Sequence, residues 1–148
     1  MITHIDIARE HRSFWGMRIF QFLLGRTLYE EYVGLYNATV DEWRTLTRFI
    51  AVSREEIQDA EALFRVAREQ AAALLDPRRA LLTPNATVGA DALVNIAHMV
   101  TTTFEKTGYH EAARRTSRLA SRTVRFRMRL RDLVRDHARA NAAMRTSR

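Results

Sequence analysis

Residues that break helices are scarce in this chain, and their placement limits the folds that it can adopt. Only five glycines and two prolines occur among 148 residues. Both prolines, Pro77 and Pro84, lie in residues 76–89, the only obvious loop. The stretches on either side are long enough for extended helices and contain nothing that forbids them. We therefore expect an all-α protein whose chain divides near residue 75.

The first half carries apolar residues at steps of three and four, the spacing of an amphipathic helix. Ser53 is a helix-capping residue followed by Glu55 and Glu56, so a shorter helix is expected from there as far as Leu75. Before it, one long helix is expected from about Met17 to Thr47. Its apolar stripe consists of Ile19, Phe22, Leu23, Tyr29, Val33, Tyr36, Val40, Trp43 and Leu46.

The second half repeats this pattern. Asp91 or Thr87 can cap a helix that is interrupted near residues 107–108, and a last helix follows. In residues 124–131 apolar side chains alternate with arginines, which is a strand signal. We favour a helix because its apolar stripe continues at helical spacing beyond Leu130. Each half is thus interpreted as a long helix, a short basic link and a shorter helix, a candidate internal repeat of about 70 residues.

The aromatic residues of the first half belong to a type that stacks on nucleobases. Their helical spacing favours instead a core or an interface between copies. We therefore expect self-association through the aromatic and apolar helix faces. The residues concerned are Trp15, Tyr29, Tyr32, Tyr36 and Trp43.

The net charge of +7 is concentrated at one end of the chain. Residues 111–148 hold 12 arginines against three acids, a balance of +9, whereas residues 1–110 carry −2. Codon usage can explain why Lys106 is the single lysine, but it does not explain the clustering. Arginines that are nearly unopposed repel one another unless a polyanion neutralises them. Nucleic acid is the expected partner, ahead of an acidic protein or a membrane surface.

Signatures of catalysis are missing from the sequence. It has no cysteine, no glycine-rich phosphate loop, no nucleophile elbow and no HExxH motif. The acid pairs 30–31 and 55–56 fall on expected helices, where solvated carboxylates are usual. We expect no enzyme, no catalytic residue, no metal site and no cofactor. The histidines lack ligand spacing; they are His4, His11, His98, His110 and His137.

The first twelve residues do not resemble a signal peptide, because His4, Asp6, Arg9 and Glu10 interrupt the region that would have to be apolar. No apolar run approaches the roughly 20 residues that span a bilayer. We expect a soluble protein that is not secreted, has no membrane partner and is located with the genome, in a nucleoid, nucleus or virion.

Four segments resemble parts of the histone fold. Residues 49–60 (FIAVSREEIQDA) look like the second loop and third helix of a histone, and residues 32–36 (YVGLY) are similar to the middle of a central helix. Residues 88–90 (VGA) resemble the start of a central helix, and residues 120–124 (ASRTV) resemble a loop that places a basic residue and a threonine beside DNA.

The resemblance implies a histone doublet, with residues 1–75 and 76–148 as two helix–loop–long helix–loop–helix halves packed on each other. It places Arg12 near Arg118 and Arg122, and it places residues 78 and 79 near Arg48 and Arg54. Together with the clustered charge it gives a set of candidate phosphate-binding residues: Arg12, Arg48, Arg54, Arg78, Arg79, Arg114, Arg115, Arg118, Arg122, Arg125, Arg127 and Arg129.

The function expected from these features is DNA compaction in the manner of chromatin proteins. Binding to double-stranded DNA would come from phosphate neutralisation and arginines in the minor groove, without base reading. The alternative is a helical structural virion protein, a capsid or nucleocapsid subunit that packages a genome. A transcription regulator is less favoured, because no set of side chains suited to base readout stands out.

Overall fold

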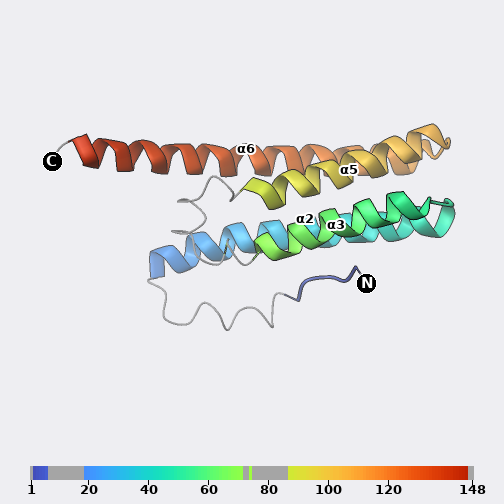
Figure 1. Ribbon diagram of the computed structural model, residues 1–148, viewed down its shortest axis with the longest axis horizontal. Helices are drawn as coiled ribbons and strands as arrows, with labels where there is room; N and C mark the ends of the chain where they lie inside the picture. Colours follow the sequence, from blue (N-terminus) through green and yellow to red (C-terminus); the bar gives the residue numbers. More distant parts are fainter. Residues whose placement is uncertain (1, 7–18, 72–73, 75–86, 147–148) are drawn as a thin grey trace.

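The computed structural model describes residues 2–6, 19–71, 74 and 87–146, with the side chains of residues 19–26 excepted. This part of the chain contains four α-helices and no strand: α2 (Ile19–Phe49), α3 (Arg54–Ala71), α5 (Val88–Lys106) and α6 (His110–Thr146) (Figure 1). The all-α prediction is confirmed. The alternation at residues 124–131 lies inside α6, so the helical interpretation of that segment is correct.

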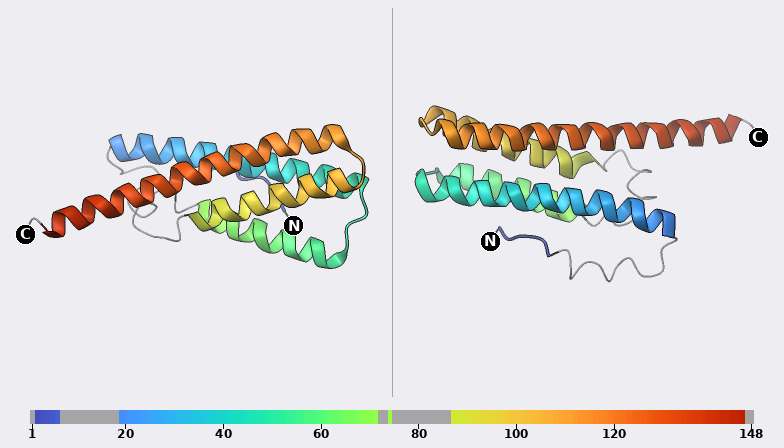
Figure 2. Two further views of the ribbon diagram at one scale, coloured as in Figure 1. Left: turned by 90° about the horizontal axis from the view of Figure 1, so that it is seen from above. Right: turned by 180° about the vertical axis from the view of Figure 1, so that it is seen from behind.

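The helices form two antiparallel hairpins, and the α5–α6 hairpin lies over the α2–α3 hairpin (Figure 1). Both hairpin turns lie at the same end of the molecule (Figures 1 and 2). The opposite end of α6 projects beyond the other described helices (Figure 2). Among the described residues, no helix is both long and apolar enough to cross a membrane.

Local sequence signals account for both turns. The Ser53 hydroxyl accepts a hydrogen bond from the Glu56 backbone N–H at 3.2 Å, which caps α3 as expected. After α5, Gly108 adopts φ +85°, and the N–H of Tyr109 donates to the Phe104 carbonyl at 2.9 Å. A glycine just after the last turn suits this left-handed conformation because it has no side chain. The predicted interruption at residues 107–108 is confirmed.

The second half does not follow the predicted order of a long and then a shorter helix. In the first half, 31 residues of α2 are followed by 18 of α3, but in the second half 19 residues of α5 are followed by 37 of α6. The reason is the early turn at Gly108, after which residues 109–148 contain no glycine or proline. Residues 120–124, interpreted as a loop, are helical, with Ala120 and Thr123 buried.

The aromatic stripe of α2 belongs to the core. Tyr32 packs against Phe126 of α6 with ring centroids 5.9 Å apart, and Tyr36 and Trp43 contact Phe64 of α3 at 5.8 and 6.5 Å. Tyr29 is also buried, whereas Trp15 lies outside the described residues. Because Tyr29, Tyr32, Tyr36 and Trp43 are buried within one chain, these four rings are not available to a second copy in this fold.

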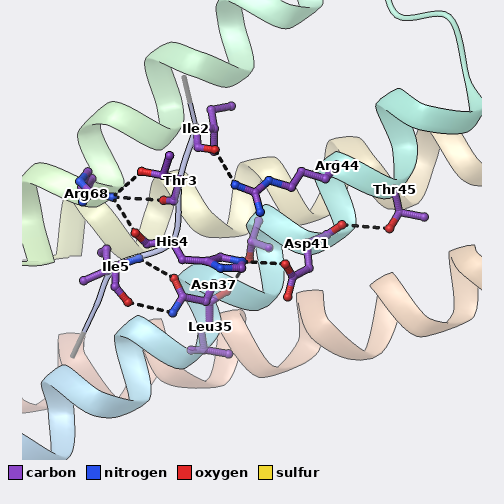
Figure 3. Close-up of polar contacts among 11 residues, drawn as sticks. Ile2, Thr3, His4, Ile5, Leu35, Asn37, Asp41, Arg44, Thr45 and Arg68 are labelled. Carbon is purple, nitrogen blue, oxygen red and sulfur yellow. Dashed lines mark hydrogen bonds and ion pairs between the residues drawn. The ribbon is translucent and has the colours of Figure 1, made fainter. Parts of the chain in front are cut away.

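Residues 2–6 form an extended segment that lies along α2 and α3 (Figure 3). The Asn37 side chain accepts from the Ile5 N–H at 2.8 Å and donates to the Ile5 carbonyl at 3.1 Å. Arg44 donates to the Ile2 carbonyl at 3.0 Å, and Arg68 donates to the carbonyls of residues 3 and 4 at 3.1 and 3.3 Å. Ile5 itself is buried in the core. The segment is therefore held mainly through its backbone.

Candidate nucleic-acid interface

One face of α6 presents a row of arginines to solvent. Arg114, Arg118, Arg122 and Arg125 follow one another at steps of four, four and three, so they lie on the same side of the helix. All four are exposed. They extend over about 16 Å at the usual rise of an α-helix. We call these four residues the arginine face.

The opposite side of α6 fixes the direction of the arginine face. Thr116, Leu119, Phe126 and Leu130 are buried against the other helices. Between residues 113 and 130, α6 is therefore amphipathic, with an apolar side in the core and a cationic side in water. The arginine face is carried by a packed helix rather than by a loop.

Within the described residues, no carboxylate forms an ion pair with a member of the arginine face. Their neighbours on α6 differ in this respect. Arg115 makes a bidentate pair with Glu42 of α2, at 2.7 Å for Nε and 2.8 Å for the second contact. Arg129 pairs with Glu31 of α2.

On the other flank of α6, two arginines share one acid of α5. Asp91 accepts from Arg127 at 3.4 Å and from Arg131 at 3.1 Å. The ion pairs on both flanks join α6 to its neighbouring helices. A phosphate that approached Arg115, Arg127 or Arg129 would have to compete with a carboxylate, whereas no carboxylate of the described residues competes at the arginine face.

Two paired arginines have further structural contacts. The hydrogen bond to Glu42, which is 15% exposed, raises the pKa of Arg115. The guanidinium of Arg129 lies 5.7 Å from the centroid of the Phe126 ring, in a cation–π contact. The sequence predicted that both residues contact phosphate. In the structure, each forms an ion pair with an acid of α2.

Of the remaining candidates, the structure describes only Arg48 and Arg54, which lie on other elements than the arginine face. Arg48 and Arg54 are exposed beside the turn between α2 and α3, at the end of the molecule that also holds the start of α6 (Figure 1). Arg12, Arg78 and Arg79 lie outside the described residues, so the expected pairing of the basic loops stays a prediction.

Two hollows open between α2 and α6, one on each side of the Glu42–Arg115 pair. The first has a volume of 570 Å³ and is lined by Glu31, Leu35, Arg122, Arg125, Met128, Arg129 and Asp132. The second has a volume of 410 Å³ and lies at the hairpin-turn end; it is lined by Thr45, Phe49, Phe104, Tyr109, His110, Glu111, Ala112 and Arg115. We call the strip that contains both hollows the α2/α6 groove.

Phe49 and Tyr109 in the second hollow were not singled out by the sequence reasoning. Phe49 falls outside the apolar stripe of α2, whose last members are Trp43 and Leu46. An apolar residue off the stripe, next to Arg48 and at a helix end, is the signal that could have drawn attention to it. Tyr109 follows the Gly108 turn and has no comparable signal.

Among the described residues, no group of three or more histidine, aspartate or glutamate side chains is arranged to hold a metal ion. His4 contacts Asp41 at 2.7 Å on the surface. His98 and His110 are exposed on separate helices. The described surface thus offers cationic and aromatic contacts.

No protein family model matches the chain, and comparisons with curated proteins and with solved structures give no significant similarity.

Proposed function

We propose that this protein binds nucleic acid through the phosphate backbone, with the arginine face of α6 as the principal contact. The observation that carries the proposal is the combination of exposure and missing counter-ions at Arg114, Arg118, Arg122 and Arg125. Each carries a charge that no carboxylate in the described part of the chain pairs with. Guanidinium groups of this kind bind phosphate oxygens by charge-assisted hydrogen bonds.

The contact would position the nucleic acid without reading its sequence. Phosphate contacts are common to all sequences, and specificity requires side chains that reach base edges. Residues 110–140 of α6 contain no asparagine or glutamine that could add base contacts beside the arginine face. Binding should therefore be indifferent to sequence and should allow many molecules to coat and compact one nucleic acid.

A histone doublet is the form of this proposal that the family resemblance implies. The capped start of α3 after Ser53 supports it, because the resemblance expects a helix there with Arg48 and Arg54 beside the preceding loop. The uninterrupted α6 and the reversed helix order of the second half argue against it. The proposal therefore rests on the arginine face and not on the histone arrangement.

The proposal is tested by the salt dependence of binding. Each neutralised phosphate contributes about 0.9 to the slope of log affinity against log salt on duplex DNA. The arginine face together with Arg48 and Arg54 gives six contacts and a slope steeper than about −5. Replacing Arg118, Arg122 and Arg125 by glutamine should lower the magnitude of that slope by about 2.7.

The matched control replaces three exposed arginines elsewhere, Arg65, Arg139 and Arg145, by glutamine. Both variants lose the same net charge, so a general field effect would weaken them equally. We expect the control to retain most of the slope. Equal slopes for the two variants, or a wild-type slope near zero, would contradict the proposal that the arginine face is the principal contact with nucleic acid.

The alternative function, a structural virion protein, uses the same arginines to line a packaged genome. Exposed apolar side chains on separate elements favour it, since Ile57 of α3 and Met128 of α6 are 36% and 56% exposed. Such a subunit should polymerise into particles of fixed size when nucleic acid is added. Analytical ultracentrifugation distinguishes this outcome from a coat whose mass grows with the length of the nucleic acid.

A further inference from the structure

Phe49 and Tyr109 are the two exposed aromatic residues among those whose side chains the structure describes, and they are neighbours. The two residues are 61% and 43% exposed, and their ring centroids are 6.4 Å apart at an interplanar angle of 38°. Phe49 ends α2, whereas Tyr109 lies in the turn between α5 and α6. The fold thus brings together two exposed rings from distant parts of the chain.

Contacts with the core fix the position of Tyr109. Tyr109 packs edge-on against the buried ring of Phe104, with centroids 6.1 Å apart. The Tyr109 N–H is bonded to the Phe104 carbonyl in the turn. Tyr109, which is held in this way, and its neighbour Phe49 both line an open hollow of 410 Å³. Large apolar side chains exposed together commonly mark a binding site.

Charge around the hollow indicates which ligand the rings suit. Arg115 lines this second hollow, and Arg118 and Arg122 follow it along α6 toward the first hollow, which Leu35 and Met128 line. The distance from residue 115 to residue 125 along the helix is about 15 Å. The α2/α6 groove therefore has an aromatic end and a cationic edge. Glu111 is the one carboxylate that lines the aromatic hollow, and it has no ion pair among the described residues. Its negative charge disfavours a phosphate there. Its oxygens can accept a hydrogen bond from the amino group of a base.

We propose that the α2/α6 groove binds single-stranded nucleic acid, with an unpaired base stacked on Phe49 and Tyr109 and the adjoining phosphates along Arg118, Arg122 and Arg125. This inference rests on the proposed function and specifies its ligand. A base in a duplex already has both faces covered, so it cannot enter the hollow. An unpaired base has a free face, and base–aromatic stacking combined with a basic groove is the usual means of binding single strands.

The test compares a fluorescently labelled mixed-sequence DNA strand with the same strand in a duplex. In the variant with Phe49→Leu and Tyr109→Leu, affinity for the single strand should fall about five-fold or more, because one stacked base contributes about 1–3 kcal/mol. Affinity for the duplex should be unchanged. The control variants Phe49→Tyr and Tyr109→Phe retain both rings and should bind both probes like the wild type.

Replacing Tyr109 also removes a contact with the core. The single variant Phe49→Leu avoids this loss, because the Phe49 ring is largely in solvent. Its thermal melt should match the wild type while its single-strand affinity falls. An equal loss on single strand and duplex, no loss on either, or a change in self-association in place of affinity would overturn this inference. Failure of the wild type to bind either probe would instead overturn the proposed function.

Discussion

Gly89 determines how closely α5 approaches α2 and α3. A Cβ atom added at this position would lie 2.5 Å from the Tyr32 Oη atom and 2.6 Å from the Gln70 Cβ atom. Real Cβ atoms do not tolerate such distances, and Tyr32 cannot move easily because its hydroxyl donates to the Ala67 carbonyl in the core. The absence of a side chain at residue 89 is therefore a packing requirement.

We predict that Gly89→Ala lowers the free energy of unfolding by about 1–3 kcal/mol, through overpacking. Gly34→Ala is the matched control, because a Cβ at this exposed position of α2 meets nothing within 4 Å. That change should stabilise the protein by about 0.5–1 kcal/mol, since alanine favours helix. Urea unfolding measures both changes, and losses of similar size would show that the close approach at Gly89 is not important.

Tyr32 gives the stability of the protein a pH dependence in the alkaline range. Burial raises the pKa of its hydroxyl, and the neighbouring Tyr36 adds to this effect. In the unfolded chain a tyrosine ionises near pH 10. Between that value and the higher pKa of the folded protein, only the unfolded state releases the proton, so stability falls as the pH rises.

We therefore predict that the free energy of unfolding is insensitive to Tyr32 below about pH 10 and decreases above it. Tyr32→Phe should cost about 1 kcal/mol at neutral pH, because the hydrogen bond to Ala67 is lost. The same variant should show a shallower decrease between about pH 9 and pH 11. Parallel curves for the two proteins in denaturant unfolding across this range would contradict the assignment.

At the scale of the helix, α6 carries two kinds of arginine: some join it to other helices through ion pairs, and others form no ion pair with the described part of the chain. Glu42 keeps Arg115 in the first group. A partly exposed ion pair contributes less than about 1 kcal/mol to stability. Removing the carboxylate should therefore cost little and release a cation beside the arginine face.

We predict that Glu42→Gln raises the affinity for nucleic acid severalfold and makes the salt dependence steeper by about 0.9, as expected for one additional phosphate contact. Glu61→Gln, which removes an exposed acid from α3, is the control for net charge. Titrations at several salt concentrations measure both variants. An unchanged slope for Glu42→Gln would mean that Arg115 does not reach the ligand.

The helices also differ in how much of their structure the sequence predicts. The start of α3 and the turn after α5 were predictable, because Ser53 and Gly108 are local signals that act within a few residues. The length of α6 was not, since a resemblance placed a loop where Ala120 and Thr123 in fact face the core. The pairing of Arg115, Arg127 and Arg129 could not be predicted either, because their acids lie on other helices and approach only in the folded chain.

At the scale of the whole molecule, the two hairpins share one core. Tyr32 of α2 contacts Phe126 of α6, and the close approach at Gly89 joins α5 to α2 and α3. If one hairpin unfolded, the residues of the other hairpin that pack against it would become exposed to solvent. The arginine clustering that indicated nucleic acid was visible in the sequence, whereas the α2/α6 groove was not, because it exists only when both hairpins pack together.

We predict a single cooperative unfolding transition for the whole chain, as expected for small domains with one core. Far-UV circular dichroism and tryptophan fluorescence should give coincident curves, since Trp43 packs against Phe64 in this core. Two separate transitions would show instead that residues 1–75 and 76–148 are independent folding units.

The contacts of the extended segment at residues 2–6 determine which amino-acid substitutions the segment tolerates. Asn37, Arg44 and Arg68 address carbonyl and amide groups, which every amino acid has, and Ile5 is the one buried side chain of the segment. Side chains of α2 and α3 therefore hold this segment largely through its backbone groups. We therefore expect residue 3 to accept other amino acids while the segment keeps its place, at the loss of the 3.5 Å contact between Arg68 and the Thr3 hydroxyl. A change at residue 4 would also remove the contact of the His4 ring with Asp41.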